Sequence, residues 1–211
     1  MGGLSVPADT DAETREVRMT PPRKEDLLAA ARRHRAGMGR RAPPVTPEPV
    51  GPGEESVWDF PRPPEVQAVA APLRVEFAGR VVAETRAGRR ICETASAPVY
   101  VFPPGDVATE LLEERPDAWS VCEWKGVATY FDLVVGDRRS EAAAFTYADP
   151  FDDLGRGYGE IAGWLAFYAG RVDAAFVGDE RVRPQPGGFY AGWVTSRLRG
   201  PIKGAPGSAG W

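Results

Sequence analysis

The sequence predicts an all-β fold, a small barrel or sandwich with one or two short helices. Short segments that alternate apolar and polar residues recur from Leu73 onward, and turn pairs such as Gly136-Asp137 and Gly178-Asp179 separate them. Successive side chains of a strand point to opposite faces of its sheet, so this alternation is typical of half-buried strands. Helical periodicity is sparse, and about eight short strands at close spacing favour a sandwich or barrel.

The clearest element is a hairpin. Leu73 to Phe77 alternates apolar and polar residues, Ala78-Gly79 supplies a turn, and residues 80–84 return. Further strands are expected at 89–93, 99–102, 119–124, 127–135, 142–147, 164–168 and 173–177. Short helices are expected at 106–112, where Asp106 is a suitable N-cap, and within 158–165.

Residues 1–56 are predicted to form a disordered, proline-rich arm. Apolar residues are sparse there, and the proline and glycine residues of 42–53 disfavour both helix and strand. One segment of the arm, residues 22–35, has the pattern of a short basic helix that stops near Gly37. Two interpretations stay open for it, a docking helix for an acidic protein partner and a solvated part of a linker.

The rest of the chain, residues 57–211, is predicted to be a single β-domain. Its last part, residues 184–211, is rich in glycine and proline but also carries Phe189, Tyr190, Trp193 and Trp211. Disordered segments are usually poor in aromatic residues. We therefore expect this segment to be an extended strap that lies on the domain.

The composition disfavours several classes of function. The 211 residues carry a net charge of −4, so no global positive field favours nucleic acid or anionic lipid. No run approaches the roughly 18 apolar residues of a membrane span, and residues 1–9 lack the features of a signal peptide. We expect a cytoplasmic protein with two free thiols, Cys92 and Cys122, although one disulfide between them is the alternative.

The segment from Cys122 to Tyr130 is the most informative part of the chain. Cys122 and Lys125 would point to opposite faces of a regular strand, but Gly126 permits a bend that brings them together. The Lys125 ammonium would then favour the thiolate of Cys122. Alternatively, Lys125 binds a carboxylate or phosphate, or forms a Schiff base. The remaining alternative is a buried structural cysteine beside a surface lysine.

Other candidate site residues end the predicted strands around this segment. Tyr130 follows on the same strand, and Glu93 is a candidate general acid or base, or an ion-pair partner of Lys125 or Arg90. Three phenols are expected to form a polar, ligand-binding rim, namely Tyr100, Tyr147 and Tyr168. Core packing is the alternative interpretation for each phenol, and it is the commoner role of such side chains.

An ordered series of motifs resembles the bacterial family catalogued as domain of unknown function 427. The resemblance spans about residues 57–211 and rests on segments 57–64, 93–100, 122–126, 148–150, 167–168 and 184–190. It implies a small all-β domain of the β-tent kind, in a largely uncharacterised family that sometimes carries a nucleotidyltransferase label. The chain departs from the family's Cys-Pro-x-Lys-Gly motif at Glu123, and from its usual Glu-Thr-Ser run at Ala95.

Nucleotide transfer is disfavoured by the carboxylates present. Such chemistry normally needs carboxylates that hold Mg²⁺ against phosphates, and the only adjacent acidic pair suited to a loop, Asp152-Asp153, is expected to be solvated. Some β-tent proteins hold zinc between paired Cys-x-x-Cys knuckles, but the two cysteines here are far apart in sequence and the only histidine, His34, lies in the arm. We expect no metal and no cofactor.

These observations predict a domain that binds an unknown small molecule around Lys125, Cys122, Glu93 and Tyr130. One form of this function is a metal-independent enzyme that uses Lys125 and Cys122. The alternative is a non-catalytic ligand- or protein-binding module, with the arm available to a protein partner. We do not expect the domain to bind nucleic acid or a membrane.

Overall fold

The computed structural model of the chain describes residues 21–37 and 45–208. It confirms the all-β prediction, because strands in several antiparallel sheets dominate, and these sheets do not close into a barrel. The described residues contain one α-helix, α1 (Lys24–Gly37). Two parts of the predicted arm, residues 1–20 and 38–44, and the last three residues of the chain lie outside the described residues.

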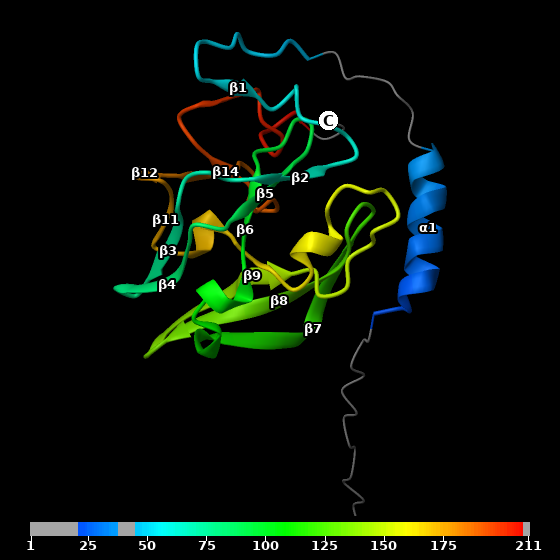
Figure 1. Cartoon of the computed structure of the whole chain (residues 1–211). Helices are drawn as coiled ribbons and strands as arrows, with labels where there is room; N and C mark the ends of the chain where they lie inside the picture. Colours follow the sequence, from blue (N-terminus) through cyan, green and yellow to red (C-terminus); the bar gives the residue numbers. More distant parts are fainter. Residues whose placement is uncertain (1–20, 38–44, 209–211) are drawn as a thin grey trace, which may run out of the picture.

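Two antiparallel sheets form the body of the domain (Figure 1). The larger has the order β2 (Glu65–Ala68), β5 (Arg89–Cys92), β6 (Val99–Phe102), β10 (Leu165–Phe167), β9 (Arg138–Thr146), β8 (Gly126–Val135) and β7 (Leu112–Cys122). The smaller has the order β12 (Glu180–Arg181), β11 (Ala174–Val177), β3 (Leu73–Phe77) and β4 (Arg80–Thr85). The strands β7, β8 and β9 follow one another in the chain and lie side by side in the sheet as antiparallel hairpins.

Two short ladders tie the ends of the domain together. β1 (Glu55–Ser56) pairs in parallel with β15 (Leu198–Arg199), and β13 (Arg183–Pro184) pairs with β14 (Trp193–Val194). Three of these four strands belong to the predicted strap. The strap thus adds both backbone pairing and side chains to the domain.

The expected helix at 106–112 is wrong. The chain instead makes 3₁₀ turns at Pro104–Asp106 and Thr109–Leu111, and β7 already begins at Leu112. Val107 lies between the turns in an extended conformation, forms a β-bridge with Ala83 and is buried in the core. This tertiary pairing overrides the local helical pattern. The turn expected within 158–165 is a 3₁₀ helix, Gly159–Ile161.

The largest core cluster includes side chains of both main sheets and of the strap. Trp193 from the strap is fully buried beside Phe102 and Phe167, and its indole N–H donates to the Phe167 carbonyl at 2.8 Å. The Trp193 ring stacks on Tyr100 with centroids 5.1 Å apart. The strap therefore completes the core of this domain.

Residues 45–56 also contact the β-domain, although the sequence placed them in the arm. The Glu48 carboxylate accepts a hydrogen bond from the Gly200 N–H at 3.0 Å, and Glu54 forms an ion pair with Arg199. Glu55 accepts two hydrogen bonds from the Arg90 guanidinium at 2.5 and 2.9 Å. These contacts place residues 45–56 with the domain.

The predicted basic helix is present as α1, which stands beside the loop that follows β9 (Figure 1). The acidic groups that it contacts belong to this chain, at Asp149 and Asp153. Asp152 is exposed, as expected, but the side chain of Asp153 is only 13% exposed and lies against two arginines. Both residues lie in an exposed stretch of the loop, as predicted, and the Asp153 carboxylate is paired there with two arginines.

Candidate functional site

A hairpin turn brings Cys122 and Lys125 to the same region. β7 ends at Cys122, β8 begins at Gly126, and these two residues pair across the hairpin. Gly126 has a φ of 94°, and a Cβ at this position would lie 3.3 Å from the ring of Phe151. A side chain here would be strained and crowded, so glycine permits the bend that the sequence predicted.

The turn opens onto a cavity of about 300 Å³ that gathers six of the seven predicted site residues. These are Glu93, Cys122, Lys125, Tyr130, Tyr147 and Tyr168. Further lining residues, which the sequence reasoning missed, include Ser120, Phe145, Gln185, Phe189, Tyr190 and Lys203. Residues from six strands or their ends, β5 to β10, and from the strap therefore meet here.

Lys125 is buried, with 8% of its surface exposed, so the surface-lysine interpretation is wrong. Its Nζ lies 5.8 Å from the centroid of the Tyr147 ring, within range of a cation–π interaction. Within residues 21–37 and 45–208, no carboxylate lies at ion-pair distance from this ammonium. A buried cation thus faces a largely aromatic cavity.

Electrostatics hold Lys125 in its charged form. Burial disfavours the ammonium, but a Cys122 thiolate, the Glu93 carboxylate and the Tyr158 oxygen favour it, and the pKa of Lys125 is raised above its ordinary value. A Schiff base requires the neutral amine as nucleophile. The raised pKa therefore favours an electrostatic role for Lys125.

The phenols form a neutral, polar wall. Burial raises the pKa of Tyr147 well above its usual range, and burial together with Tyr130 raises the pKa of Tyr168. The hydroxyls of Tyr130 and Ser120 are hydrogen-bonded at 2.7 Å. Phe145 lies among the three rings, with centroids 5.5 to 6.0 Å away.

Glu93 lines the cavity, but its ion-pair partner is neither Lys125 nor Arg90. It forms an ion pair with Arg62 at 3.3 Å, and its side chain is 23% exposed. Arg90 instead forms an ion pair with Glu55. The carboxylate of Glu93 is therefore partly neutralised at the edge of the cavity.

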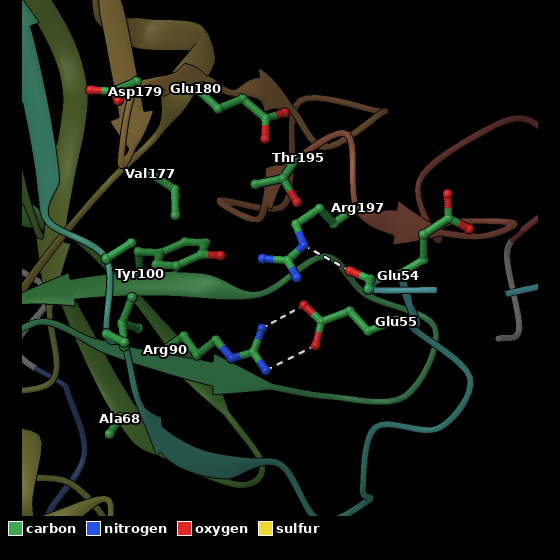
Figure 2. A pocket seen from close by; sticks show the side chains of 14 residues that line it. Glu54, Glu55, Ala68, Arg90, Tyr100, Val177, Asp179, Glu180, Thr195 and Arg197 are labelled. Atoms are coloured by element: carbon green, nitrogen blue, oxygen red, sulfur yellow. Dashed lines mark hydrogen bonds and ion pairs between the residues drawn. The ribbon is translucent and has the colours of Figure 1, made fainter. Parts of the chain in front are cut away.

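Tyr100 lies elsewhere, so the prediction of one shared phenolic rim is wrong. It lines a second cavity of about 690 Å³, where Figure 2 shows its hydroxyl pointing toward the guanidinium groups of Arg90 and Arg197. Burial raises the pKa of Tyr100 to about 12. The structure thus separates Tyr100 from Tyr147 and Tyr168.

The strap closes one side of the Lys125 cavity through a buried amide. Gln185 is 2% exposed, accepts a hydrogen bond from the Ala97 N–H at 3.1 Å and donates to the Lys203 carbonyl at 2.9 Å. The Lys203 ammonium lies 5.4 Å from the centroid of Tyr190. The aromatic residues of a glycine-rich tail were the sequence signal for this wall, but they did not indicate its course.

Cys92 and Cys122 are both free thiols, which rules out the disulfide alternative in this structure. Cys92 is fully buried, and burial raises its pKa to about 12. Cys122 is half-buried and lines the cavity, with its sulfur 3.8 Å from a carboxylate oxygen of Glu123. Only Cys122 is therefore placed to react with a molecule in the cavity.

The described residues, 21–37 and 45–208, lack two further features. In these ranges no helix combines the length and apolar character needed to cross a bilayer. The same residues hold no cluster of three or more His, Cys, Asp or Glu side chains suited to a metal ion.

Comparison with known proteins gives the family. No curated protein matches the chain. The model of the family NTP_transf_9, described as a domain of unknown function (DUF427), matches residues 54–178, which include the Cys122–Gly126 turn and most of both main sheets. Because this match covers more than half of the chain, the protein belongs to the DUF427 family.

Proposed function

We propose that the domain binds a small organic anion whose carboxylate pairs with Lys125. The observation that carries the proposal is the Lys125 ammonium, buried in a cavity with no carboxylate at ion-pair distance among the described residues. A buried charge is costly unless it is paired. An anionic ligand would supply a carboxylate at ion-pair distance from this ammonium.

The rest of the cavity suits the body of such a ligand. A volume of about 300 Å³ is at the small end of ligand pockets. Rings of Tyr130, Phe145 and Tyr168 provide an apolar surface, and the Tyr130 and Ser120 hydroxyls add polar groups. Lys203 contributes a second positive charge to a lining that also includes two carboxylates, Glu93, which is paired with Arg62, and Glu123. A planar or aromatic monocarboxylate fits this chemistry best.

Alkylation of Cys122 tests the proposal without knowledge of the natural ligand. Iodoacetate is an anion and iodoacetamide is its neutral analogue, so the ratio of their rates at Cys122 reports the local charge. A change in the thiolate fraction alters both rates equally and cancels in the ratio. One favourable unit charge nearby contributes about 1 kcal/mol, so Lys125→Met should lower the iodoacetate-to-iodoacetamide ratio roughly fivefold.

Peptide mapping by mass spectrometry separates Cys122 from Cys92, and Arg33→Met provides the matched control. This variant also replaces a basic residue by methionine, but Arg33 is exposed on α1 and does not line the cavity. The control should keep the wild-type ratio. The same ratio in wild type and Lys125→Met would contradict an anion site at Lys125.

Catalysis by Cys122 is a second candidate, because its sulfur lines the same cavity as the ammonium. In that case the thiolate attacks the carbonyl carbon of a bound ester or thioester, a carbon–sulfur bond forms, and an alcohol or thiol leaves. Water then hydrolyses the acyl-enzyme. Cys122→Ala should retain anion binding under the first proposal and abolish turnover under the second. The free thiols support a cytoplasmic location for either function.

A further inference from the structure

Helix α1 is joined to the loop after β9 by charged contacts. Asp153 accepts a hydrogen bond from Arg32 at 2.9 Å and two from Arg35 at 2.9 and 3.3 Å. Lys24 pairs with Asp149 near the start of the helix, at 2.5 Å. Three basic residues on one side of α1 thus face two carboxylates of this loop.

The helix also covers the residue before Lys125. The Arg35 side chain is only 8% exposed, and its guanidinium carbon lies 5.8 Å from the centroid of the Trp124 ring. Ala31, one turn earlier on α1, is buried. Trp124 itself is 6% exposed. Arg35 therefore contacts both Trp124 and Asp153.

The loop holds Lys125 from the other side. The Phe151 N–H donates to the Lys125 carbonyl at 3.1 Å, and the fully buried Phe151 ring lies against Gly126. Asp153 follows two residues later. Trp124 and the loop at 151–153 fix the backbone of Lys125. Arg35 contacts both of these segments and so connects them.

We propose that α1 is a clamp that positions Lys125 in the cavity, with Arg35 and Asp153 as its positioning residues. This inference rests on the proposed function, because it concerns where the Lys125 ammonium lies. The Arg35 and Asp153 side chains are only 8% and 13% exposed, so loss of either partner is expected to lower the stability of the domain as well. The effect of the clamp on Lys125 is therefore measured through the charge of the cavity, in variants that remain folded.

Charge reversal on α1 tests the clamp, with the alkylation ratio at Cys122 as the readout. Arg35→Glu places a carboxylate against Asp153 and releases Trp124, so the iodoacetate-to-iodoacetamide ratio should fall at least about threefold toward that of Lys125→Met. Arg33→Glu is the matched control, since it makes the same charge change on the same helix. Arg33 is exposed and contacts neither Trp124 nor Asp153, so its ratio should stay at the wild-type value.

Rescue separates positioning from general damage. Arg35→Glu combined with Asp153→Arg restores an ion pair of reversed polarity and should restore most of the ratio. Fully buried Cys92 reports opening of the domain, and it should stay unmodified in every variant. If Arg35→Glu does not fold, Asp153→Asn removes the charge alone and should lower the ratio by a smaller factor.

Two results would overturn the clamp. One is a wild-type ratio in Arg35→Glu or in folded Asp153→Asn while Lys125→Met differs from wild type. The other is alkylation of Cys92 together with Cys122, which would show a structural role only. Equal ratios in wild type and Lys125→Met would overturn the proposed function, and the clamp with it.

Discussion

Truncation of the chain before Pro184 will leave a domain that does not fold. The segment removed contains Trp193, Val194 and Leu198, all buried, and the strands that pair with β1 and β13. Full burial of one large apolar side chain contributes about 1.5–3 kcal/mol. The sum over these residues is a large share of the about 5–15 kcal/mol that keeps a domain folded. Circular dichroism and thermal melting of the truncated chain check this result.

A point variant gives the same test inside an intact chain. Trp193→Ala removes a fully buried ring that contacts Tyr100 and Phe102, and it should lower the free energy of unfolding by about 3–5 kcal/mol. Phe189→Ala is the matched control, because Phe189 lies in the same strap but is 76% exposed, and it should change stability by less than about 0.5 kcal/mol. Equal urea midpoints for the two variants, or an unchanged melting temperature after truncation, would refute a structural strap.

The second large effect is loss of anion binding in Lys125→Met with the fold retained. Methionine keeps most of the aliphatic stem and removes the charge, so the free energy of unfolding at neutral pH should change by no more than about 1 kcal/mol. Loss of folding would instead make Lys125 a structural partner of Glu93 or Cys122. Urea denaturation at pH 7, followed by ligand titration of the folded variant, separates these outcomes.

The difference in unfolding free energy between wild type and Lys125→Met should depend on pH with a definite sign. The pKa of Lys125 is raised in the folded state, so its stabilising contribution is fully present below the ordinary value of 10.5 and is lost as the pH rises through the folded pKa. The stability of wild type relative to Lys125→Met should be constant from pH 6 to about pH 9 and should fall above about pH 10.5. An increase of that difference at high pH would contradict the assigned charge state.

Local patterns predicted most of the strands. Val99–Phe102 and Leu73–Phe77 have the expected bounds, because alternation along a strand needs no knowledge of its neighbours. The segment around Val107 was misread because its bridge to Ala83 is a contact between residues distant in sequence. The course of the strap was beyond prediction for the same reason, although its aromatic content indicated that it packs on the domain.

The site was predictable where its residues share one turn or adjacent strands. Cys122, Lys125 and Tyr130 come from a single hairpin, so a correct bend at Gly126 was enough to unite them. Tyr100 was assigned to the wrong cavity because the prediction did not consider which face of its strand the side chain occupies. Val99 lines the Lys125 cavity, and Tyr100, one residue later on β6, points into the other cavity. Because side chains alternate between the two faces of a strand, strict use of this two-residue period would have placed Val99 and Tyr100 on opposite faces of β6.

Charge alone could not show what α1 contacts. The sequence contains many acidic residues, and only the folded chain places Asp149 and Asp153 beside the basic side of the helix. Among the described residues the basic side of α1 contacts acidic groups of the chain itself, and the docking of an acidic protein partner stays a prediction.

Binding of matched carboxylates and amides tests the central claim most directly. Pairs such as benzoate and benzamide have the same shape, but only the carboxylate can pair with the Lys125 ammonium. A thermal-shift screen of such pairs, confirmed by calorimetry, should show stabilisation of the wild type and of Arg33→Met by one or more carboxylates, with the matched amides bound at least about tenfold more weakly. Lys125→Met should lose that preference while it remains folded. A carboxylate preference that persists in Lys125→Met, or no preference in the wild type across a broad set of aromatic and aliphatic pairs, would contradict the account.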